Sequence, residues 1–257
     1  MNGKRGKYRA GDELRLPPLF FQGPAACPCG FCGAIKMKRF ITFDGIEGCG
    51  KTTQMGLAEA WLRERGAPVL ATAEPGGTPL GRKIREILLN RGAWAIGAEA
   101  ELLLFAAARA QHVREAILPA LERGEWVLCD RFADATLAYQ GFGRGLDAGF
   151  IRTLNAFSAQ ALKPEMTLLF DLPVEVGLAR AKKRTAGVRP AAAEDRFEQE
   201  ERVFHGRIRE GYLSLAAAEP ERFRIIDGAG SVEIVHRDVC RCLMALPQIL
   251  FRGGGRA

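Results

Sequence analysis

One stretch of the sequence combines the residues needed to bind a chain of phosphates. A short apolar run, Phe40–Phe43, leads through Asp44 into Gly45-Ile-Glu-Gly-Cys-Gly-Lys-Thr52, which has the spacing G-x-x-x-x-G-K-T. Between a strand and a helix, such a loop points successive backbone N–H groups at an anion beside the helix N-terminus. We therefore predict an ATP-binding loop, whose members are Gly45, Ile46, Glu47, Gly48, Cys49, Gly50, Lys51 and Thr52.

The polar side chains at two strand ends suggest phosphoryl-transfer chemistry. Lys51 can reach the β- and γ-phosphates, and the Thr52 hydroxyl can ligate Mg²⁺. Asp130, after a later apolar run, can hold the same ion through water, and Arg131 can hold a second phosphate. The alternative is that Asp130 and Arg131 form a salt bridge at a strand end.

Two groups of residues at helical spacing suit a flat ligand. Phe105 and Arg109 lie four residues apart and share a helix face. A ring beside a guanidinium suits a heterocycle with a carbonyl edge. Thr136, Tyr139 and Gln140 share another face. Taken alone, these residues have structural alternatives: Phe105 in the core, Arg109 as a solvated charge, and Tyr139 packed with its hydroxyl at the surface.

The elements that position these residues alternate along the chain. Five apolar runs predict buried parallel strands at Phe40–Phe43, Val69–Ala73, Trp126–Cys129, Met166–Asp171 and Phe223–Asp227. Helical patterns cover about Thr52–Arg65, Leu80–Leu89, Ala98–Gln111, Asp147–Ala161, Val174–Lys183, Arg196–Ala217 and Val232–Leu246. This alternation predicts one doubly wound α/β domain, with a five-stranded parallel sheet flanked by helices on both faces.

Composition excludes several classes of protein. Of the 257 residues, 47% are hydrophobic and 26% charged, which is typical of a folded chain. The longest apolar run, Leu102–Ala108, is too short to span a bilayer. The seven cysteines are odd in number, which disfavours a disulfide scaffold and favours a reducing cytoplasm. Because the net charge of +7 comes without interleaved basic and aromatic residues, we do not expect a nucleic-acid partner.

The two ends of the chain differ from the middle. Residues 1–36 carry six basic and two acidic residues and show no apolar periodicity, so we predict a disordered extension. Its cysteines, Cys27, Cys29 and Cys32, lack a fourth ligand nearby for a zinc site. We predict a kinase-type domain over residues 37–247 and a frayed tail over residues 248–257.

The motifs, taken in order, resemble the thymidylate kinase family over about residues 38–246. They are Glu74-Pro-Gly-Gly-Thr78, Phe105-Ala-Ala-Ala-Arg109, Cys129-Asp-Arg131, Thr136-Leu-Ala-Tyr-Gln140 and Asp195-Arg-Phe-Glu198. The resemblance implies a P-loop kinase fold with a mobile lid, and transfer of the γ-phosphoryl of Mg-ATP to dTMP for dTTP synthesis. It also implies a homodimer. The alternatives are a kinase for another nucleotide or nucleoside, or a non-catalytic regulatory module.

The resemblance further implies roles in binding the thymidine part of dTMP. Phe105 would stack on thymine, and Arg109 would donate to its carbonyl. Thr136 and Gln140 would help to hold the base, and Tyr139 would lie against the sugar.

It also implies roles around the acceptor phosphate. Arg85 and Arg131 would bind the phosphate itself. Glu47 would contact the 3′-hydroxyl, and Asp44 would lie near the metal and the acceptor phosphate. Ala73 departs from the family, whose members of this style often carry Arg there, which leaves one support for the phosphate absent.

A basic segment over about residues 180–195 is expected to form the lid, although such runs are often only solvated. The family places a catalytic arginine either inside the phosphate loop or on the lid. Gly48 stands where the first style has its arginine, so the chain resembles the bacterial, lid-donating style. The lid candidates are Arg184 and Arg189 for catalysis and Arg196 for ATP binding.

Overall fold

The computed structural model describes residues 38–89, 95–186, 197 and 200–247, without the side chains of residues 184–186. The chain divides into two units, Met1–Lys36 and Met37–Ala257, and the description concerns the second. The predictions for residues 1–36, for the tail over residues 248–257, and for Arg189 and Arg196 lie outside the described residues.

A five-stranded parallel sheet forms the centre of this unit, as predicted. Its strands are β1 (Phe40–Asp44), β2 (Val69–Ala73), β3 (Trp126–Asp130), β4 (Met166–Asp171) and β5 (Phe223–Asp227), in the order β2-β3-β1-β4-β5. Strands β1 and β3 each run one residue further than the apolar pattern predicts. Because Phe43 is in register with Asp130, the loops after β1 and β3 emerge side by side at the carboxyl edge.

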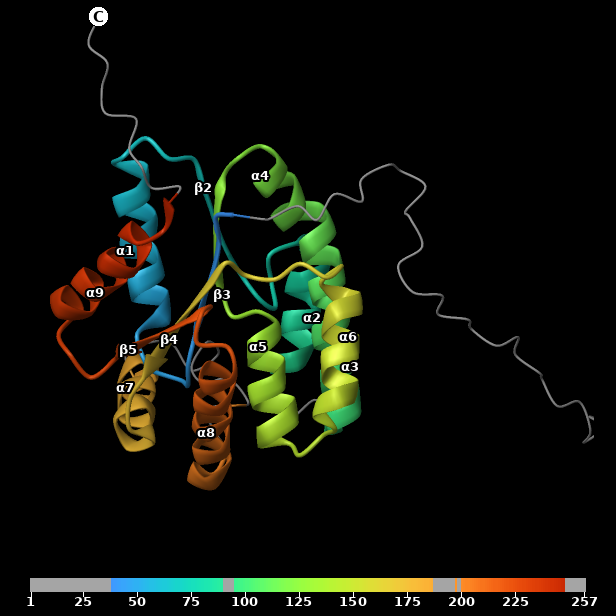
Figure 1. Cartoon of the computed structure of the whole chain (residues 1–257). Coiled ribbons are helices and arrows are strands. Elements are labelled where there is room, and N and C mark those ends of the chain that lie inside the picture. The colour runs from blue at the N-terminus through green and yellow to red at the C-terminus, as the bar shows by residue number, and fades with distance from the viewer. Residues whose placement is uncertain (1–37, 90–94, 187–196, 198–199, 248–257) are drawn as a thin grey trace, which may run out of the picture. The chain divides into compact units, whose positions relative to one another are not determined.

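Helices cover both faces of the sheet (Figure 1). The α-helices are α1 (Lys51–Arg63), α2 (Pro79–Leu89), α3 (Ala98–His112), α4 (Leu118–Glu122), α5 (Ala133–Thr136), α6 (Ala148–Ser158), α7 (Val174–Ala186), α8 (Arg202–Ala218) and α9 (Val232–Met244). Two π-helical segments, η1 (Val113–Ile117) and η2 (Leu137–Gly143), continue α3 and α5. Helices α1 and α9 pack together on one face, and α4 packs on β3 from the other.

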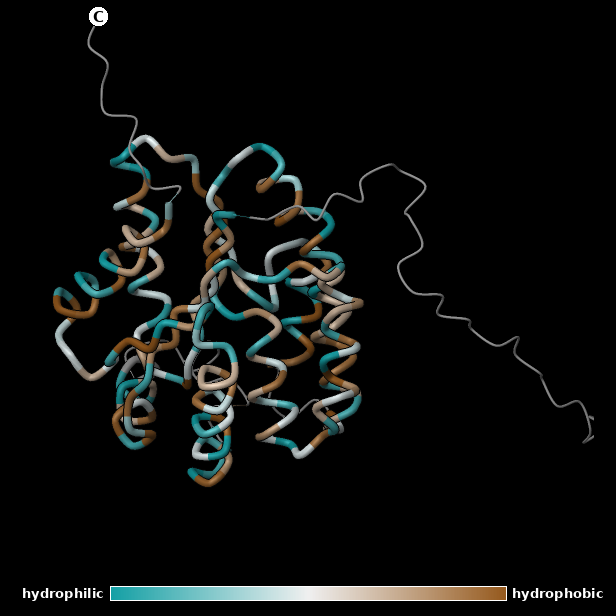
Figure 2. Tube along the Cα trace, viewed as in Figure 1, coloured by the Kyte–Doolittle hydropathy of each residue, from teal (hydrophilic) through white to brown (hydrophobic). Residues whose placement is uncertain are grey.

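The strand side chains alternate between two apolar layers. Ile41 and Phe43 belong to one buried cluster, and Phe40 belongs to another with Val127 and Cys129. Burial on both faces explains why the strands are continuous apolar runs rather than alternating ones. The apolar segments concentrate along the strands, whereas the helices carry hydrophilic stretches as well (Figure 2). Within the described ranges, no helix is both long and apolar enough to cross a membrane.

Several predicted helix boundaries are wrong. The helix from Ala98 continues beyond His112 through η1 and α4, because a π-helical turn precedes Pro119 and the helix does not stop there. Helix α8 begins at Arg202, not at Arg196. Helix α6 ends at Ser158, since Gln160 and Ala161 take positive φ angles of 52° and 58°.

The first part of the predicted lid is helical. Helix α7 runs to Ala186, so the first residues of the segment 180–195 are helical. Alanine, lysine and arginine are strong helix formers, and they extend α7 beyond its predicted end. Residues 187–196 lie outside the description.

Candidate active site

The phosphate loop surrounds a buried cation. It connects β1 to α1, and Gly50 caps the helix with a φ angle of 95°. Lys51 is only 6% exposed, and its Nζ donates to the carbonyls of Gly45 (3.1 Å) and Ile46 (2.8 Å). The ammonium group therefore lies inside a loop that precedes a helix N-terminus, which is an anion-binding arrangement.

The loop approaches the backbone of α7 closely at two glycines. Gly48 has a φ angle of +69°, and a β-carbon there would lie 2.0 Å from the carbonyl oxygen of Gly177. A β-carbon on Gly177 would in turn lie 2.6 Å from the carbonyl oxygen of Glu47. No side chain fits at either position.

Cys49 differs from its neighbours in the loop because its thiol faces inward. The residue is buried in the main apolar cluster, and Lys51 Nζ lies 3.3 Å from its Sγ. It contributes its backbone to the loop, and its side chain belongs to the core.

Thr52 and Asp130 meet at the carboxyl edge of the sheet. The Thr52 hydroxyl donates to Oδ2 of Asp130 over 2.8 Å. The structural alternative, a salt bridge at this strand end, does occur, but it joins Arg131 to Glu47. A hydroxyl and a carboxylate side by side are the oxygen ligands that Mg²⁺ accepts together with phosphates and water.

Arg131 is held by four neighbours. Its Nη1 donates to the carbonyl of Gly45 (3.0 Å) and to the hydroxyl of Tyr212 (3.2 Å), and its Nη2 donates to Oε1 of Glu47 (3.1 Å). The guanidinium carbon lies 4.7 Å from the centre of the Tyr139 ring. A φ angle of 68°, unusual for a residue with a β-carbon, turns this side chain toward the phosphate loop.

Two buried acids beside Arg131 have opposite pKa shifts. Burial acts to raise the pKa of Glu47, but His205, Arg131 and Lys51 outweigh it and hold that pKa at about 2. Burial and the nearby Asp134 raise the pKa of Asp44 to about 7. Glu47 is therefore a fixed negative charge, whereas Asp44 titrates near neutrality.

Helix α8 supplies two residues that the sequence analysis missed. The Tyr212 hydroxyl donates to Oδ1 of Asp44 over 3.0 Å. Nδ1 of His205 lies 3.2 Å from Oε2 of Glu47, without hydrogen-bond geometry to any described residue. The seven-residue spacing of His205 and Tyr212 was the available signal, because it places two polar rings on one helix face.

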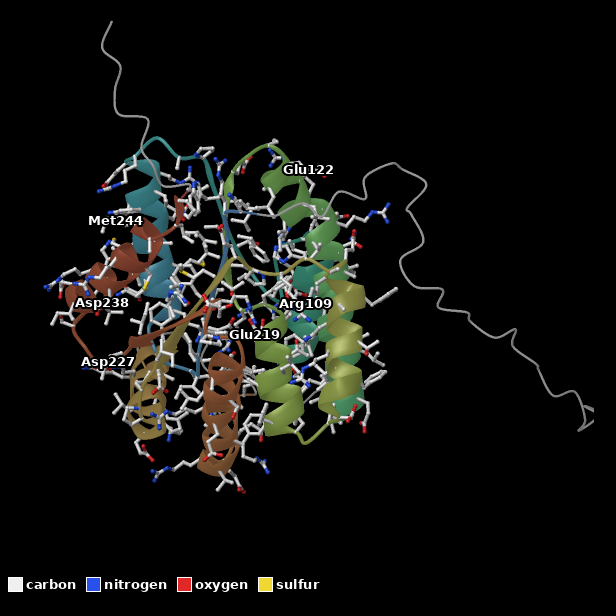
Figure 3. All side chains as sticks on the ribbon, viewed as in Figure 1. Arg109, Glu122, Glu219, Asp227, Asp238 and Met244 are labelled. Carbon is white, nitrogen blue, oxygen red and sulfur yellow. The ribbon has the colours of Figure 1, made fainter. Side chains whose placement is uncertain are left out.

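Arg109 lies inside the protein, between helices rather than on the surface (Figure 3). It is 1% exposed, so the solvated alternative is wrong. Its Nε donates to Glu74 (2.8 Å), its Nη1 to Asn155 (2.6 Å) and its Nη2 to the Thr136 hydroxyl (2.8 Å). Asn155 was not singled out from the sequence, since nothing along the chain connects it to Arg109.

The remaining acceptor-side residues surround the same space. Phe105 is partly buried, with its ring centre 6.2 Å from that of Phe197. The Tyr139 hydroxyl donates to Glu47, so the alternative with this hydroxyl at the surface is wrong. Arg85 Nη1 donates to the carbonyl of Pro75 over 3.0 Å.

One cavity of about 760 Å³ unites these groups. The predicted residues that line it are Glu47, Gly48, Lys51, Thr52, Arg85, Phe105, Arg109, Asp130, Arg131, Thr136, Tyr139 and Gln140. Arg82 and Phe197 also line it, although the sequence analysis gave them no role. Of the predicted residues that the structure describes, Asp44, Gly45, Ile46, Cys49 and Gly50 are not part of this lining. The Arg184 side chain is outside the description.

A phosphate loop that opens into one cavity with arginines and aromatic rings defines the chain as a P-loop phosphotransferase. Comparison with known proteins narrows the class. The family model described as thymidylate kinase matches residues 43–239. The chain therefore belongs to the thymidylate kinase family.

Individual relatives agree with this result. The thymidylate kinase of Syntrophus aciditrophicus is 61% identical over 212 residues, which cover 82% of this chain and 97% of that protein. That of Citrifermentans bemidjiense is 54% identical, with 84% and 95% covered. The crystal structure of thymidylate kinase from Ehrlichia chaffeensis is similar with a TM-score of 0.63 and 32% identity, over 80% of this chain and 98% of that one.

Proposed function

We propose how the residues of this cavity carry out the thymidylate kinase reaction. The chain is a dTMP kinase, which transfers the γ-phosphoryl of ATP to dTMP and gives dTDP and ADP for dTTP biosynthesis. The observation that carries the assignment of roles is the shared cavity, which is lined both by Lys51 of the phosphate loop and by Phe105 and Arg109. Donor and acceptor can therefore bind close together.

On the donor side, Gly45 to Thr52 bind the phosphates of ATP. Lys51 Nζ neutralises charge that develops between the β- and γ-phosphates, which is the electrostatic part of catalysis. Thr52 and Asp130, 2.8 Å apart, hold Mg²⁺, which supplies further neutralisation of phosphate charge when it is bound.

On the acceptor side, Arg131 and Arg85 bind the phosphate of dTMP. The contacts of Arg131 with Glu47 and Gly45 orient its guanidinium before substrate arrives, so less ordering is needed on binding. Ala73 carries no charge, whereas family members of this style often have an arginine at its position. Arg82 lines the same cavity and adds a positive charge there. The attacking phosphate oxygen is already ionised, so alignment replaces a strong general base.

The thymidine part of dTMP occupies the space between α3 and η2. Phe105 stacks on the base, Arg109 donates to a base carbonyl, and Thr136 and Gln140 complete the base contacts. Tyr139 lies against the sugar, and Glu47 faces the 3′-hydroxyl. Asp44 acts from behind the cavity wall by accepting a hydrogen bond from Tyr212, which in turn contacts Arg131.

We assign the chain to the lid-donating style of its family. A side chain at position 48 would collide with the backbone of Gly177 at 2.0 Å, so this position cannot supply an arginine. The charge must come from elsewhere, and Arg184, Arg189 and Arg196 are the candidates. Replacing each with Ala and measuring kcat tests them: the residue that acts on the transferred phosphoryl lowers kcat most, whereas an ATP-binding residue mainly raises the KM for ATP.

Homodimer formation is supported by an apolar surface on three adjacent helices. Helices α2, α3 and α6 pack side by side (Figure 1). Their exposed large apolar residues are Leu80, Ile87, Leu103, Phe150 and Phe157. A surface of this kind is typical of a protein–protein interface. Light scattering after size exclusion should give about twice the chain mass, and Phe157→Asp should give monomers, whereas a monomeric wild type would contradict the dimer.

The free thiols of Cys49, Cys129, Cys240 and Cys242 support a reducing, cytoplasmic location.

The activity itself is tested by a coupled ADP-release assay with Mg-ATP and a panel of nucleoside monophosphates. We expect turnover with dTMP well above that with dCMP, dAMP and dGMP. ATP binding without turnover of any acceptor would contradict the assignment.

A further inference from the structure

A fully buried carboxylate lies behind the residues that we assign to the base. Glu101 is 0% exposed in the first turn of α3, four residues before Phe105 and eight before Arg109, so the three share one side of the helix. Gln140 Nε2 donates to its Oε1 over 2.7 Å, and Arg144 Nη2 donates to its Oε2 over 3.2 Å. A carboxylate buried to this extent is costly unless it is paired.

Arg144 forms a salt bridge with the buried carboxylate of Glu101. Its own partners are Glu101 and Glu200, the second over 2.6 Å, and its guanidinium lies 4.5 Å from the centre of the Phe204 ring. Burial opposes its charge, but Glu101 and Glu200 raise the pKa of Arg144 above its ordinary value. In this salt bridge both oxygens of Glu101 accept hydrogen bonds, Oε1 from Gln140 and Oε2 from Arg144.

This fixes the orientation of the Gln140 amide. A carboxylate has no proton to donate, so the group of Gln140 that faces Glu101 must be the NH₂ group and not the carbonyl. The carbonyl oxygen Oε1 then lies on the other side of the amide carbon. Because Gln140 is part of the cavity lining, Oε1 is the group available to a ligand there.

A hydrogen-bond acceptor at the position of Gln140 Oε1 distinguishes pyrimidine bases by the donors and acceptors on the edge that carries N3. Thymine and uracil present an N3–H donor between two carbonyls, whereas cytosine has a lone pair at N3 and an amino group at position 4. Arg109 donates, and Gln140 Oε1 accepts, so the pair complements the thymine edge. Against cytosine, Oε1 would meet a second acceptor, and the buried groups would be left unpaired.

We propose that Glu101 is a specificity-determining positioning residue, which selects thymine over cytosine by orienting Gln140. The inference rests on the proposed contact of Gln140 with the base. It acts without touching substrate, since Glu101 lies behind Gln140 and outside the described lining of the cavity.

The test is the substitution Glu101→Gln, which can donate as well as accept and so frees Gln140 to turn. We expect the ratio of kcat/KM for dTMP to that for dCMP to fall about tenfold, through the KM of the acceptor and with the KM for ATP unchanged. The ratio of dTMP to dUMP should stay constant, because the two bases share the same edge. Glu99→Gln is the matched control, an exposed acid in the same helical turn.

A second variant shows whether the effect passes through Gln140. Gln140→Leu should lower the dTMP-to-dCMP ratio by itself, and adding Glu101→Gln to it should lower the ratio no further. If Glu101→Gln does not fold, Gln140→Leu alone decides: an unchanged ratio overturns the proposal. Equal losses for dTMP, dUMP and dCMP, or additive effects of the two changes, also overturn it. Failure of the wild type to phosphorylate dTMP would instead contradict the proposed function.

Discussion

The phosphate loop and the acceptor side of the cavity are built in different ways. The loop is eight consecutive residues, and its lysine is held by carbonyls five and six residues away in the chain. On the acceptor side, Arg109 is held by Glu74, Asn155 and Thr136, which are 27 to 46 residues distant. The donor half therefore depends on local backbone geometry, and the acceptor half on packing between separate elements.

The largest effect is expected within the loop itself. Lys51→Ala removes the charge that faces the transferred phosphoryl, and kcat should fall by about 10³-fold or more. Circular dichroism and the coupled assay measure fold and activity together. Lys83→Ala, on the exposed side of α2 and paired with Glu86, is the control and should keep full activity. Near-normal turnover by folded Lys51→Ala would contradict the role.

The acceptor half should be sensitive to residues that never touch substrate. Asn155→Ala removes the partner of Arg109 Nη1, and the KM for dTMP should rise about tenfold because the guanidinium loses its orientation. Gln54→Ala is the comparison behind the phosphate loop, since Gln54 is a buried amide that bonds the carbonyl of Val232. It should lower Tm and leave both KM values unchanged. Equal changes in the KM for dTMP in Asn155→Ala and Gln54→Ala would contradict the distinction between the donor half and the acceptor half of the cavity.

Sugar selection is expected to depend on Tyr139, whose hydroxyl donates to Glu47. Tyr139→Ala opens space where a ribose 2′-hydroxyl would project. The kcat/KM for the ribonucleotide analogue should rise about tenfold relative to dTMP, while activity on dTMP itself falls. The measurement is the ratio of the two kcat/KM values. A constant ratio would make Tyr139 a packing residue and leave Glu47 as the sugar contact.

A smaller effect concerns stability and pH behind the loop. Burial and Asp134 raise the pKa of Asp44 to about 7, so between about pH 4 and 7 the unfolded chain loses this proton before the folded one does. The free energy of unfolding should therefore fall as pH rises through this range. In Asp44→Asn, the fall in the free energy of unfolding over this range should be smaller than in the wild type by about 1–4 kcal/mol.

Urea unfolding of both proteins at pH 4.5 and 7 measures the difference. Glu47 is present in both proteins, and its pKa of about 2 keeps it ionised in the folded state at both pH values, so its contribution cancels in the comparison. If the free energy of unfolding changed with pH in the same way in the wild type and in Asp44→Asn, Asp44 would be ionised in the folded protein over this whole pH range.

The smallest effect is expected at the N-terminus. We propose that residues 1–36 are dispensable, because the first strand begins after them and they have no apolar periodicity. Deleting them should change kcat and Tm little. A loss of several degrees in Tm would show that they pack on the kinase unit.

The same contrast explains what the sequence could predict. The five strands and the phosphate loop were readable because a buried parallel strand is a continuous apolar run and the loop is contiguous. Phe105, Arg109 and Tyr139 were found through helical spacing together with a family resemblance. The physical roles of Asn155 and Glu101 were not readable, because their partners lie 46 and 39 residues away. His205 and Tyr212 looked like part of an ordinary helix face.

The errors in the elements also have physical causes. The helix predicted to end near Gln111 continues because a π-helical segment follows His112, and the chain stays helical to Glu122. The segment from Arg180 was interpreted as a loop because it contains Gly187 and Pro190, although the helix propensity of its first residues favours the extension of α7 to Ala186.

The contact between Gly48 and Gly177 has an evolutionary consequence. Each glycine leaves no room for a β-carbon because the backbone of the other segment occupies that space. An arginine could enter the phosphate loop only after α7 had withdrawn, and α7 could not withdraw without leaving the loop unsupported on that side. Under the lid-donating assignment that we propose, a single substitution at position 48 could not move the catalytic arginine into the loop, because the backbone of Gly177 occupies that space.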